Sequence, residues 1–72
     1  MIILEQKVAK EYIEYQGKTY RCRDSLPKYR YELPDAIHFG ECVQNAGNEV
    51  IMVKTNTEYR YYIRKNEPNN PA

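Results

Sequence analysis

Residues 49–65 read EVIMVKTNTEYRYYIRK and hold the densest run of strand-forming residues in the chain. The apolar run at 50–53 is unbroken and rich in β-branched side chains, which indicates a strand covered on both faces. Residues 59–64 alternate between two faces, as in a half-buried strand. A polar Thr-Asn-Thr segment joins the two runs. The stretch therefore predicts a β-hairpin whose first strand is central in a sheet.

The alternation divides the second strand of this hairpin into a core face and a solvent face. The core face carries Tyr59, Tyr61 and Ile63. The solvent face carries Arg60, Tyr62 and Arg64. The chain has eight Tyr, one Phe and no Trp, so most tyrosines are expected to pack in the core. Those assigned to the core are Tyr20, Tyr29, Tyr31, Tyr59 and Tyr61. Tyr62 is the tyrosine that we expect to be exposed.

The 72 residues are enough for one small domain. We expect a single β-rich domain over residues 1–65 and a flexible tail over residues 66–72, where Pro and Asn replace large apolar residues. Glu5 and Lys7 interrupt the apolar start, so no secretory leader is expected. Two cysteines without such a leader predict reduced thiols and a cytoplasmic protein. No stretch is apolar and long enough to predict a membrane span.

The first part of the chain allows two interpretations. Apolar and aromatic residues at positions 4, 8, 12 and 15 fall on one helical stripe, which favours a helix over residues 2–15. Tyr, Ile and Thr also cluster on both sides of Gln16-Gly17, which favours strands at 11–15 and 18–23 joined by a two-residue turn. We prefer this hairpin, preceded by a first strand within residues 1–8.

The middle of the chain is interrupted by proline and glycine. Residues 24–27, Asp-Ser-Leu-Pro, predict a break, and a further strand is expected over residues 28–33. Residues 36–44 alternate as in a strand, which we prefer, although Pro34 before them and Gly47 after them would suit a helix. Gly40 weakens the helical alternative by about 1 kcal/mol relative to Ala.

These segments together predict a mainly β fold. Its expected form is a small antiparallel meander of five or six strands, packed as a rolled sheet or as a barrel of SH3-like architecture. The comparison concerns architecture alone. The alternative is an α+β domain, in which one helix, at residues 2–15 or 35–46, packs on an antiparallel sheet.

Charge is unevenly distributed, although the net charge is only +1. Residues 18–30 hold five basic residues and one acidic residue, whereas residues 31–58 hold five acidic residues and one basic residue. Such a dipolar surface suits a protein partner, or self-association into a homo-oligomer through paired patches. The sequence pI of about 7.7 is low for a general nucleic-acid coat.

Arginines at outward strand positions define the candidate binding face. Its predicted members are Arg21, Arg23, Arg30, Arg60, Tyr62 and Arg64. Tyrosine and arginine are enriched at protein-binding hot spots, so we expect a small regulatory or accessory protein that binds a protein partner through this face. The alternative is a small-barrel nucleic-acid-binding protein that uses the same residues for backbone contact and base stacking. Whether they meet in one patch depends on strand order.

The residue types that carry catalysis or hold metals are sparse. Cys22, His38 and Cys42 lack the short ligand pairs typical of zinc modules, so buried or structural thiols are expected instead of a metal site. A single histidine and scattered carboxylates form no catalytic triad or paired-acid motif. The three glycines form no phosphate-binding loop. We therefore expect a protein that is not an enzyme and that has no cofactor.

Overall fold

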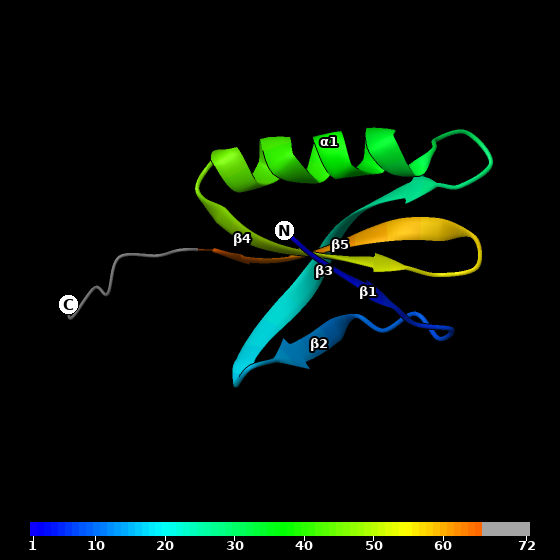
Figure 1. The fold of residues 1–72 in the computed structure, drawn as a ribbon. Coiled ribbons are helices and arrows are strands. Elements are labelled where there is room, and N and C mark those ends of the chain that lie inside the picture. Colours follow the sequence, from blue (N-terminus) through cyan, green and yellow to red (C-terminus); the bar gives the residue numbers. More distant parts are fainter. Residues whose placement is uncertain (66–72) are drawn as a thin grey trace.

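The computed structural model describes residues 1–65, so the predicted tail at 66–72 lies outside the described residues (Figure 1). Five strands and one helix follow in the order β1 (Ile2–Glu5), β2 (Tyr12–Tyr15), β3 (Lys18–Pro27), α1 (Leu33–Asn45), β4 (Asn48–Lys54) and β5 (Glu58–Lys65). The fold is mostly β, with a curled, half-barrel sheet and one helix. The predicted fold class is thus confirmed, as is the helix of the α+β alternative near residues 35–46.

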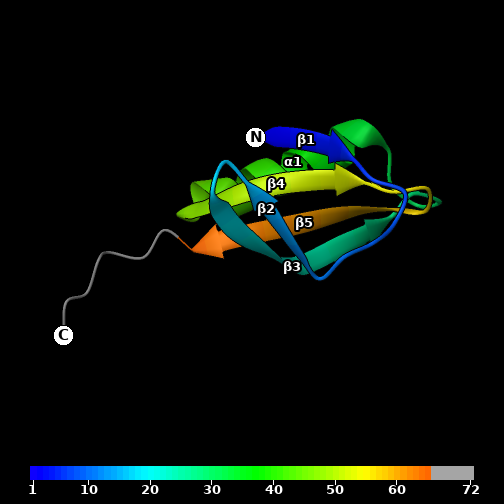
Figure 2. The same cartoon turned by 90° about the horizontal axis from the view of Figure 1, so that it is seen from below.

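The five strands form one sheet in the order β1-β4-β5-β3-β2. β1 pairs with β4 in parallel, and the other neighbours pair in antiparallel fashion. The strand order therefore differs from a simple meander, because α1 carries the chain from β3 across to β4 and leaves β5 between them. Figures 1 and 2 show how β3 twists through the molecule and carries β2 beneath the sheet, on the side away from α1.

The hairpin of β4 and β5 lies at the centre of the sheet, as predicted. All four residues at 50–53 are buried, and Ile51 lies opposite Tyr62. Thr55 organises the turn: its Oγ1 accepts hydrogen bonds from the backbone N–H groups of Thr57 and Glu58, at 3.3 and 3.1 Å. The same hydroxyl donates to the carbonyl of Glu58. The side chain thus replaces the glycine that tight hairpins often use.

Each face of this central hairpin is covered by its own core. The helix-side core lies between the sheet and α1 and is built on Ala36, Val50, Met52, Tyr59 and Tyr61. The hairpin-side core lies on the other face, between β4–β5 and the β2–β3 end of the same sheet, which curls beneath them, and is built on Ile13, Tyr20, Ile51, Val53 and Tyr62. The expectation that Tyr62 is exposed is wrong, since its exposed fraction is 0%. The strand pattern is correct, but the β2–β3 hairpin covers the face that we expected to be wet.

Helix α1 replaces the strand that we preferred at residues 36–44. Its first turn carries a capping box, in which Asp35 Oδ2 accepts a hydrogen bond from the backbone N–H of Glu32 at 3.1 Å. Pro34 occupies the first turn, where its missing N–H costs no intrahelical bond. These N-terminal signals outweigh the intrinsic cost of Gly40. The preference for a strand here was wrong, and the helical alternative was right.

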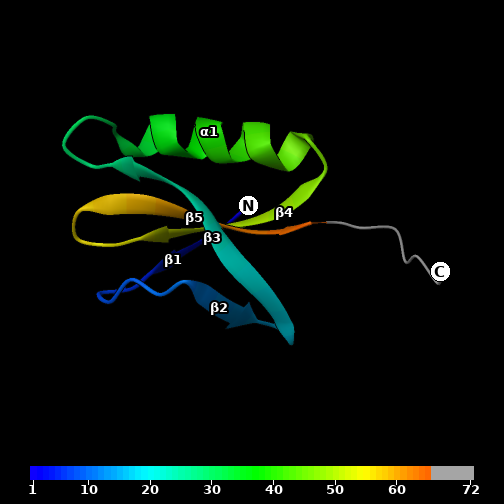
Figure 3. The same cartoon turned by 180° about the vertical axis from the view of Figure 1, so that it is seen from behind.

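Gly40 is placed where the helix approaches the sheet most closely. A Cβ at this position would collide with the side chain of Met1 and lie 3.2 Å from a ring carbon of Tyr61. The Tyr61 hydroxyl also donates a 2.6 Å hydrogen bond to the carbonyl of Ala36, and Phe39 packs edge-on against the Tyr61 ring. Glycine here therefore serves packing, and not flexibility. Figure 3 shows α1 lying along one face of the sheet.

Within residues 2–33 the preferred N-terminal hairpin is confirmed, and two other predictions are wrong. Residues 2–15 form two strands and no helix, and Gln16 and Gly17 both have the positive φ of the predicted turn. The predicted break at 24–27 is wrong, because β3 continues to Pro27 through a bulge between Cys22 and Asp24. Residues 28–33 form no strand. They turn back through hydrogen bonds from the N–H groups of Arg30 and Tyr31 to the carbonyl of Pro27.

Candidate functional site

The structure separates the six residues that the sequence assigned to one binding face. Tyr62 lies in the hairpin-side core, and the partly buried Arg60 donates a hydrogen bond to its hydroxyl. Arg64 lies at the far end of β5 and Arg30 lies in the turn before α1. Arg21 and Arg23 are exposed on β3. The six residues therefore do not form one patch: Arg60 and Tyr62 lie together, Arg21 and Arg23 lie together on β3, and Arg30 and Arg64 lie apart from both pairs.

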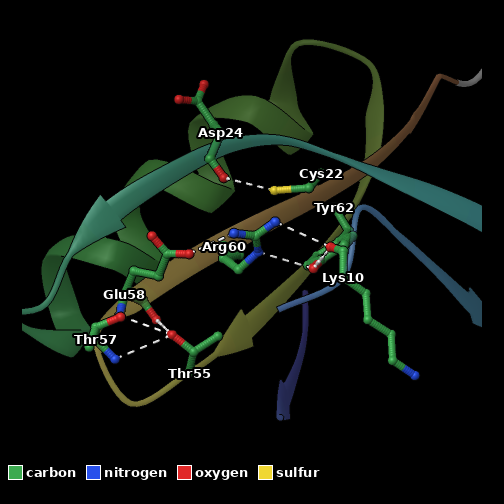
Figure 4. Close-up of polar contacts among 8 residues, drawn as sticks. All are labelled: Lys10, Cys22, Asp24, Thr55, Thr57, Glu58, Arg60 and Tyr62. Carbon is green, nitrogen blue, oxygen red and sulfur yellow. Dashed lines mark hydrogen bonds and ion pairs between the residues drawn. The ribbon is translucent and has the colours of Figure 1, made fainter. Parts of the chain in front are cut away.

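Arg60 is the centre of a polar cluster beneath the sheet (Figure 4). Its Nη1 donates to Glu58 Oε1 at 2.6 Å, and its Nε donates to the Tyr62 hydroxyl at 3.1 Å. Its Nη2 and the Tyr62 hydroxyl both donate to the backbone carbonyl of Lys10. The bond to Glu58 raises the pKa of the Arg60 guanidinium above its ordinary value, so its charge is fixed. The cluster ties the segment between β1 and β2 to the centre of the sheet.

Arg64 takes part in a second ion cluster, at the opposite end of β5. Glu49 accepts from Arg64 Nη1 at 2.7 Å and from Lys18 Nζ at 3.2 Å. The Arg64 hydrogen bond, followed by that of Lys18, lowers the pKa of the Glu49 carboxyl. The pairs join β3, β4 and β5 at the surface, where ion pairs contribute little to stability. Arg64 is therefore paired within the chain.

The exposed cation–aromatic surface is made by the β2–β3 hairpin. Tyr12 lies opposite Arg21 in the strand register, so their side chains share one face. The Arg21 guanidinium carbon lies 5.7 Å from the centre of the Tyr12 ring, and Arg21 Nη2 is 3.2 Å from Glu11 Oε1. Arg23 follows at the β3 bulge and is exposed, with no hydrogen bond or ion pair to another residue within 1–65. We call Tyr12, Arg21 and Arg23 the hairpin surface.

The sequence analysis missed Tyr12 as a surface residue. Its strand has Ile13 buried and both neighbours exposed, with 51% of Tyr12 open to solvent. The signal was available, because alternation about Ile13 places Tyr12 on the outer face. Tyr29, which we assigned to packing, is 89% exposed beside Arg30. Tyr29 was expected to be buried and is exposed, which is the reverse of the error for Tyr62. The cause is the turn that replaces the predicted strand at 28–33.

A lysine-lined cavity of about 360 Å³ lies where β1 ends and β4 turns into β5. Its lining residues are Glu5, Gln6, Lys7, Lys28, Lys54, Thr55 and Asn56. Lys54 Nζ is ion-paired with Glu5 at 3.1 Å, and Lys28 Nζ lies 5.5 Å from the centre of the Tyr59 ring. Two of the three lysines are therefore engaged within the chain. Gln6 Oε1 is buried and accepts no hydrogen bond from residues 1–65.

The thiols and the histidine form no larger cluster in the described part of the chain. Cys22 is partly buried in the hairpin-side core, and Cys42 is exposed on α1. Cys42 Sγ lies 3.8 Å from His38 Nε2, one helical turn away. Reading residues 36–44 as a strand hid this i,i+4 pair. Within residues 1–65, no group of three or more Cys, His, Asp or Glu residues is arranged to hold a metal ion.

Comparisons with protein-family models, with curated proteins and with solved structures found no match to this chain. Over residues 1–65, no helix has the length and apolarity that crossing a membrane requires.

Proposed function

We propose that the protein is a small, non-enzymatic binding module of the cytoplasm that regulates or assists a protein partner, and that it contacts this partner through the hairpin surface. The observation that carries the proposal is the exposed Tyr12 ring with the Arg21 guanidinium beside it. Tyrosine and arginine are enriched among residues that dominate binding energy. A tyrosine offers a large contact area with few rotatable bonds, so little conformational entropy is lost when it is covered.

The local charges favour a partner with acidic groups. Glu11 already balances Arg21, whereas Arg23 has no ion-pair partner within residues 1–65. An acidic side chain on the partner would complement Arg23 directly, and a second one would compete with Glu11 for the Arg21 guanidinium. Strand pairing with β3 holds Tyr12 in place, so the surface is formed before the partner arrives.

Nucleic-acid binding is the competing function, and the structure gives it fewer contacts than the sequence suggested. Base stacking was assigned to Tyr62, which is buried, and backbone contact was partly assigned to Arg60, which is bonded to Glu58. Arg64 is paired with Glu49. The remaining predicted cations are Arg21 and Arg23 on the hairpin surface and Arg30 in the turn before α1. A strand-tracking groove needs several cations in a row beside stacking rings. We therefore favour the protein partner.

The test compares two exposed tyrosine–arginine pairs of the same chain. The experimental variant is Tyr12→Ala with Arg23→Glu. The control variant is Tyr29→Ala with Arg30→Glu, which makes the same chemical change at the turn before α1. Each tagged protein is used to capture proteins from its native host, and the captured partner is then purified and titrated against all three by calorimetry.

We expect the wild type and the control variant to bind the purified partner alike, and the experimental variant to bind it at least about tenfold more weakly, since hot-spot truncations cost about 2 kcal/mol or more. Equal binding by both variants would overturn the assignment to the hairpin surface. Titration of a labelled single-stranded oligonucleotide at low salt separates the competing function. Affinity that falls steeply as salt rises would favour nucleic acid.

A further inference from the structure

The outer edge of β1 has no pairing strand among residues 1–65, and apolar side chains lie beside it. β1 and β2 are the two ends of the sheet, and within the same residues β1 pairs with β4 alone. Figure 2 shows β1 as the outermost strand, with β4 on its inner side. Ile2 and Ile3 are 37% and 39% exposed. The strand carries no proline, lysine or bulge, and its protection against pairing is limited to its short length and to Glu5 at its end.

The backbone groups that point outward belong to Ile3 and Glu5. The N–H of Gln6 donates to the carbonyl of Lys54 at 3.0 Å, so Gln6 directs its backbone groups toward β4. Successive residues of a strand direct these groups to opposite edges, so Leu4 and Ile2 also bond β4. Ile3 and Glu5 therefore present their N–H and C=O groups to the open side. These are donors and acceptors for a further strand.

We propose that this edge pairs with β1 of a second copy of the chain, in antiparallel fashion about a two-fold axis through Ile3. Hydrogen bonds across such a pair form where residues with outward-pointing backbone groups lie opposite each other. Three central registers satisfy this condition: Ile3 opposite Ile3, Ile3 opposite Glu5, and Glu5 opposite Glu5. Ile3 opposite Ile3 also places Ile2 opposite Leu4 and Met1 opposite Glu5, so the three central pairs are apolar and Glu5 lies at the ends of the pairing. Ile3 opposite Glu5 would set a carboxylate against an isoleucine, and Glu5 opposite Glu5 would set like charges together.

The first register is self-complementary, and this identifies a second copy as the occupant. A two-fold axis normal to the sheet joins the two copies into a continuous ten-stranded sheet with both α1 helices on one face. The other free edge, β2, exposes Tyr12 and Glu14 and lacks this apolar match. The inference goes beyond the proposed function, because the hairpin surface lies at the opposite end of the sheet.

Association is measured by sedimentation velocity of the full chain over about 10 µM to about 1 mM, because an interface of one short strand per copy is small and weak. Ile3→Pro removes the outward N–H and leaves the bonds to β4 intact, since an edge strand tolerates proline on its solvent side. Ile3→Val keeps the N–H and the apolar side chain and is the matched control. Ile3→Lys places two like charges on the axis, with Val8→Lys as its control at an exposed site.

We expect the wild type, Ile3→Val and Val8→Lys to show a concentration-dependent dimer, and Ile3→Pro and Ile3→Lys to weaken it at least about tenfold. Nuclear magnetic resonance spectra establish that each variant is folded, and if Ile3→Pro unfolds, Ile3→Lys decides. In a Cys22→Ser, Cys42→Ser background, oxidation should cross-link Ile3→Cys into dimers more readily than Glu5→Cys. A wild type that stays monomeric over the whole range, or a dimer that is indifferent to Ile3→Pro and Ile3→Lys, would overturn the proposal.

Discussion

At the scale of single residues, the tyrosines differ in role: Tyr61 and Tyr62 pack in the two cores, whereas Tyr12 is exposed on the hairpin surface. Tyr61 and Tyr62 are adjacent, and both are fully buried, because alternate residues of β5 face different cores. Each hydroxyl is satisfied by a backbone carbonyl, that of Ala36 for Tyr61 and that of Lys10 for Tyr62. A buried hydroxyl without such a partner would carry a large desolvation cost. The two rings thus fix α1 and the β1–β2 connection to the same strand.

Tyr61 makes the stability of the protein sensitive to alkaline pH. Burial, reinforced by Tyr59 and Asp24, raises the pKa of Tyr61 to about 12. The unfolded value is about 10, so the stabilisation is fully present below about pH 10 and is lost as the pH rises toward 12. Tyr61→Phe should lower the free energy of unfolding at pH 7 by about 1 kcal/mol, because the bond to Ala36 is lost, and should flatten the alkaline decline.

The measurement is the urea midpoint at a series of pH values from neutral to strongly alkaline. Tyr29→Phe is the control, because Tyr29 is exposed and the substitution should leave the curve unchanged. An alkaline decline of the same size in Tyr61→Phe as in the wild type would show that Tyr61 is not its source.

At the scale of elements, Gly40 makes α1 depend on tertiary packing. Gly40→Ala would raise the intrinsic helix propensity by about 1 kcal/mol. The added Cβ would displace the flexible end of the Met1 side chain at little cost, but it would lie 3.2 Å from a ring carbon of Tyr61, whose position is fixed by its hydrogen bond to Ala36. Overpacking against such a ring costs about 1–3 kcal/mol. We expect a net loss of stability, measured by urea denaturation. Gln44→Ala, on the exposed side of the same helix, should be neutral or slightly stabilising. A more stable Gly40→Ala variant would contradict the close approach of helix and sheet.

The elements that local signals specify were predicted correctly, and those that depend on remote contacts were not. The turn at Gln16-Gly17 and the hairpin of β4 and β5 follow from backbone preference and strand pattern. The burial of Tyr62 was not predicted, because alternation distinguishes the two faces of a strand but does not show which of them is covered. The residues that cover Tyr62 belong to the β2–β3 hairpin, far away in sequence. Arg60 bonds the Tyr62 hydroxyl under the same hairpin, so the same covering removed both residues from the predicted binding face. Asp35 and Pro34 did signal a helix, but Gly40 was weighed by its propensity and not by its packing.

At the scale of the whole molecule, two cores share one pair of strands. Val50 and Met52 of β4 face α1, whereas Ile51 and Val53 face the β2–β3 hairpin. Neither face of the central hairpin can lose its cover without exposing apolar side chains of the same two strands to water. A chain of this size has little stability to spare. The two layers should therefore unfold together in one cooperative transition, although they lie on opposite sides of the sheet.

This cooperativity is tested by weakening each core separately. Ile13→Ala truncates the hairpin-side core and Met52→Ala the helix-side core, and each should lower the free energy of unfolding by about 2–5 kcal/mol. In both variants the helical signal in far-ultraviolet circular dichroism and the tyrosine signal in the near ultraviolet should be lost at the same urea concentration. The exposed substitution Thr19→Ala serves as the control on β3. If Ile13→Ala lost the tyrosine signal first and kept its helix, the two layers would be separate folding units, and the shared strands would not couple them.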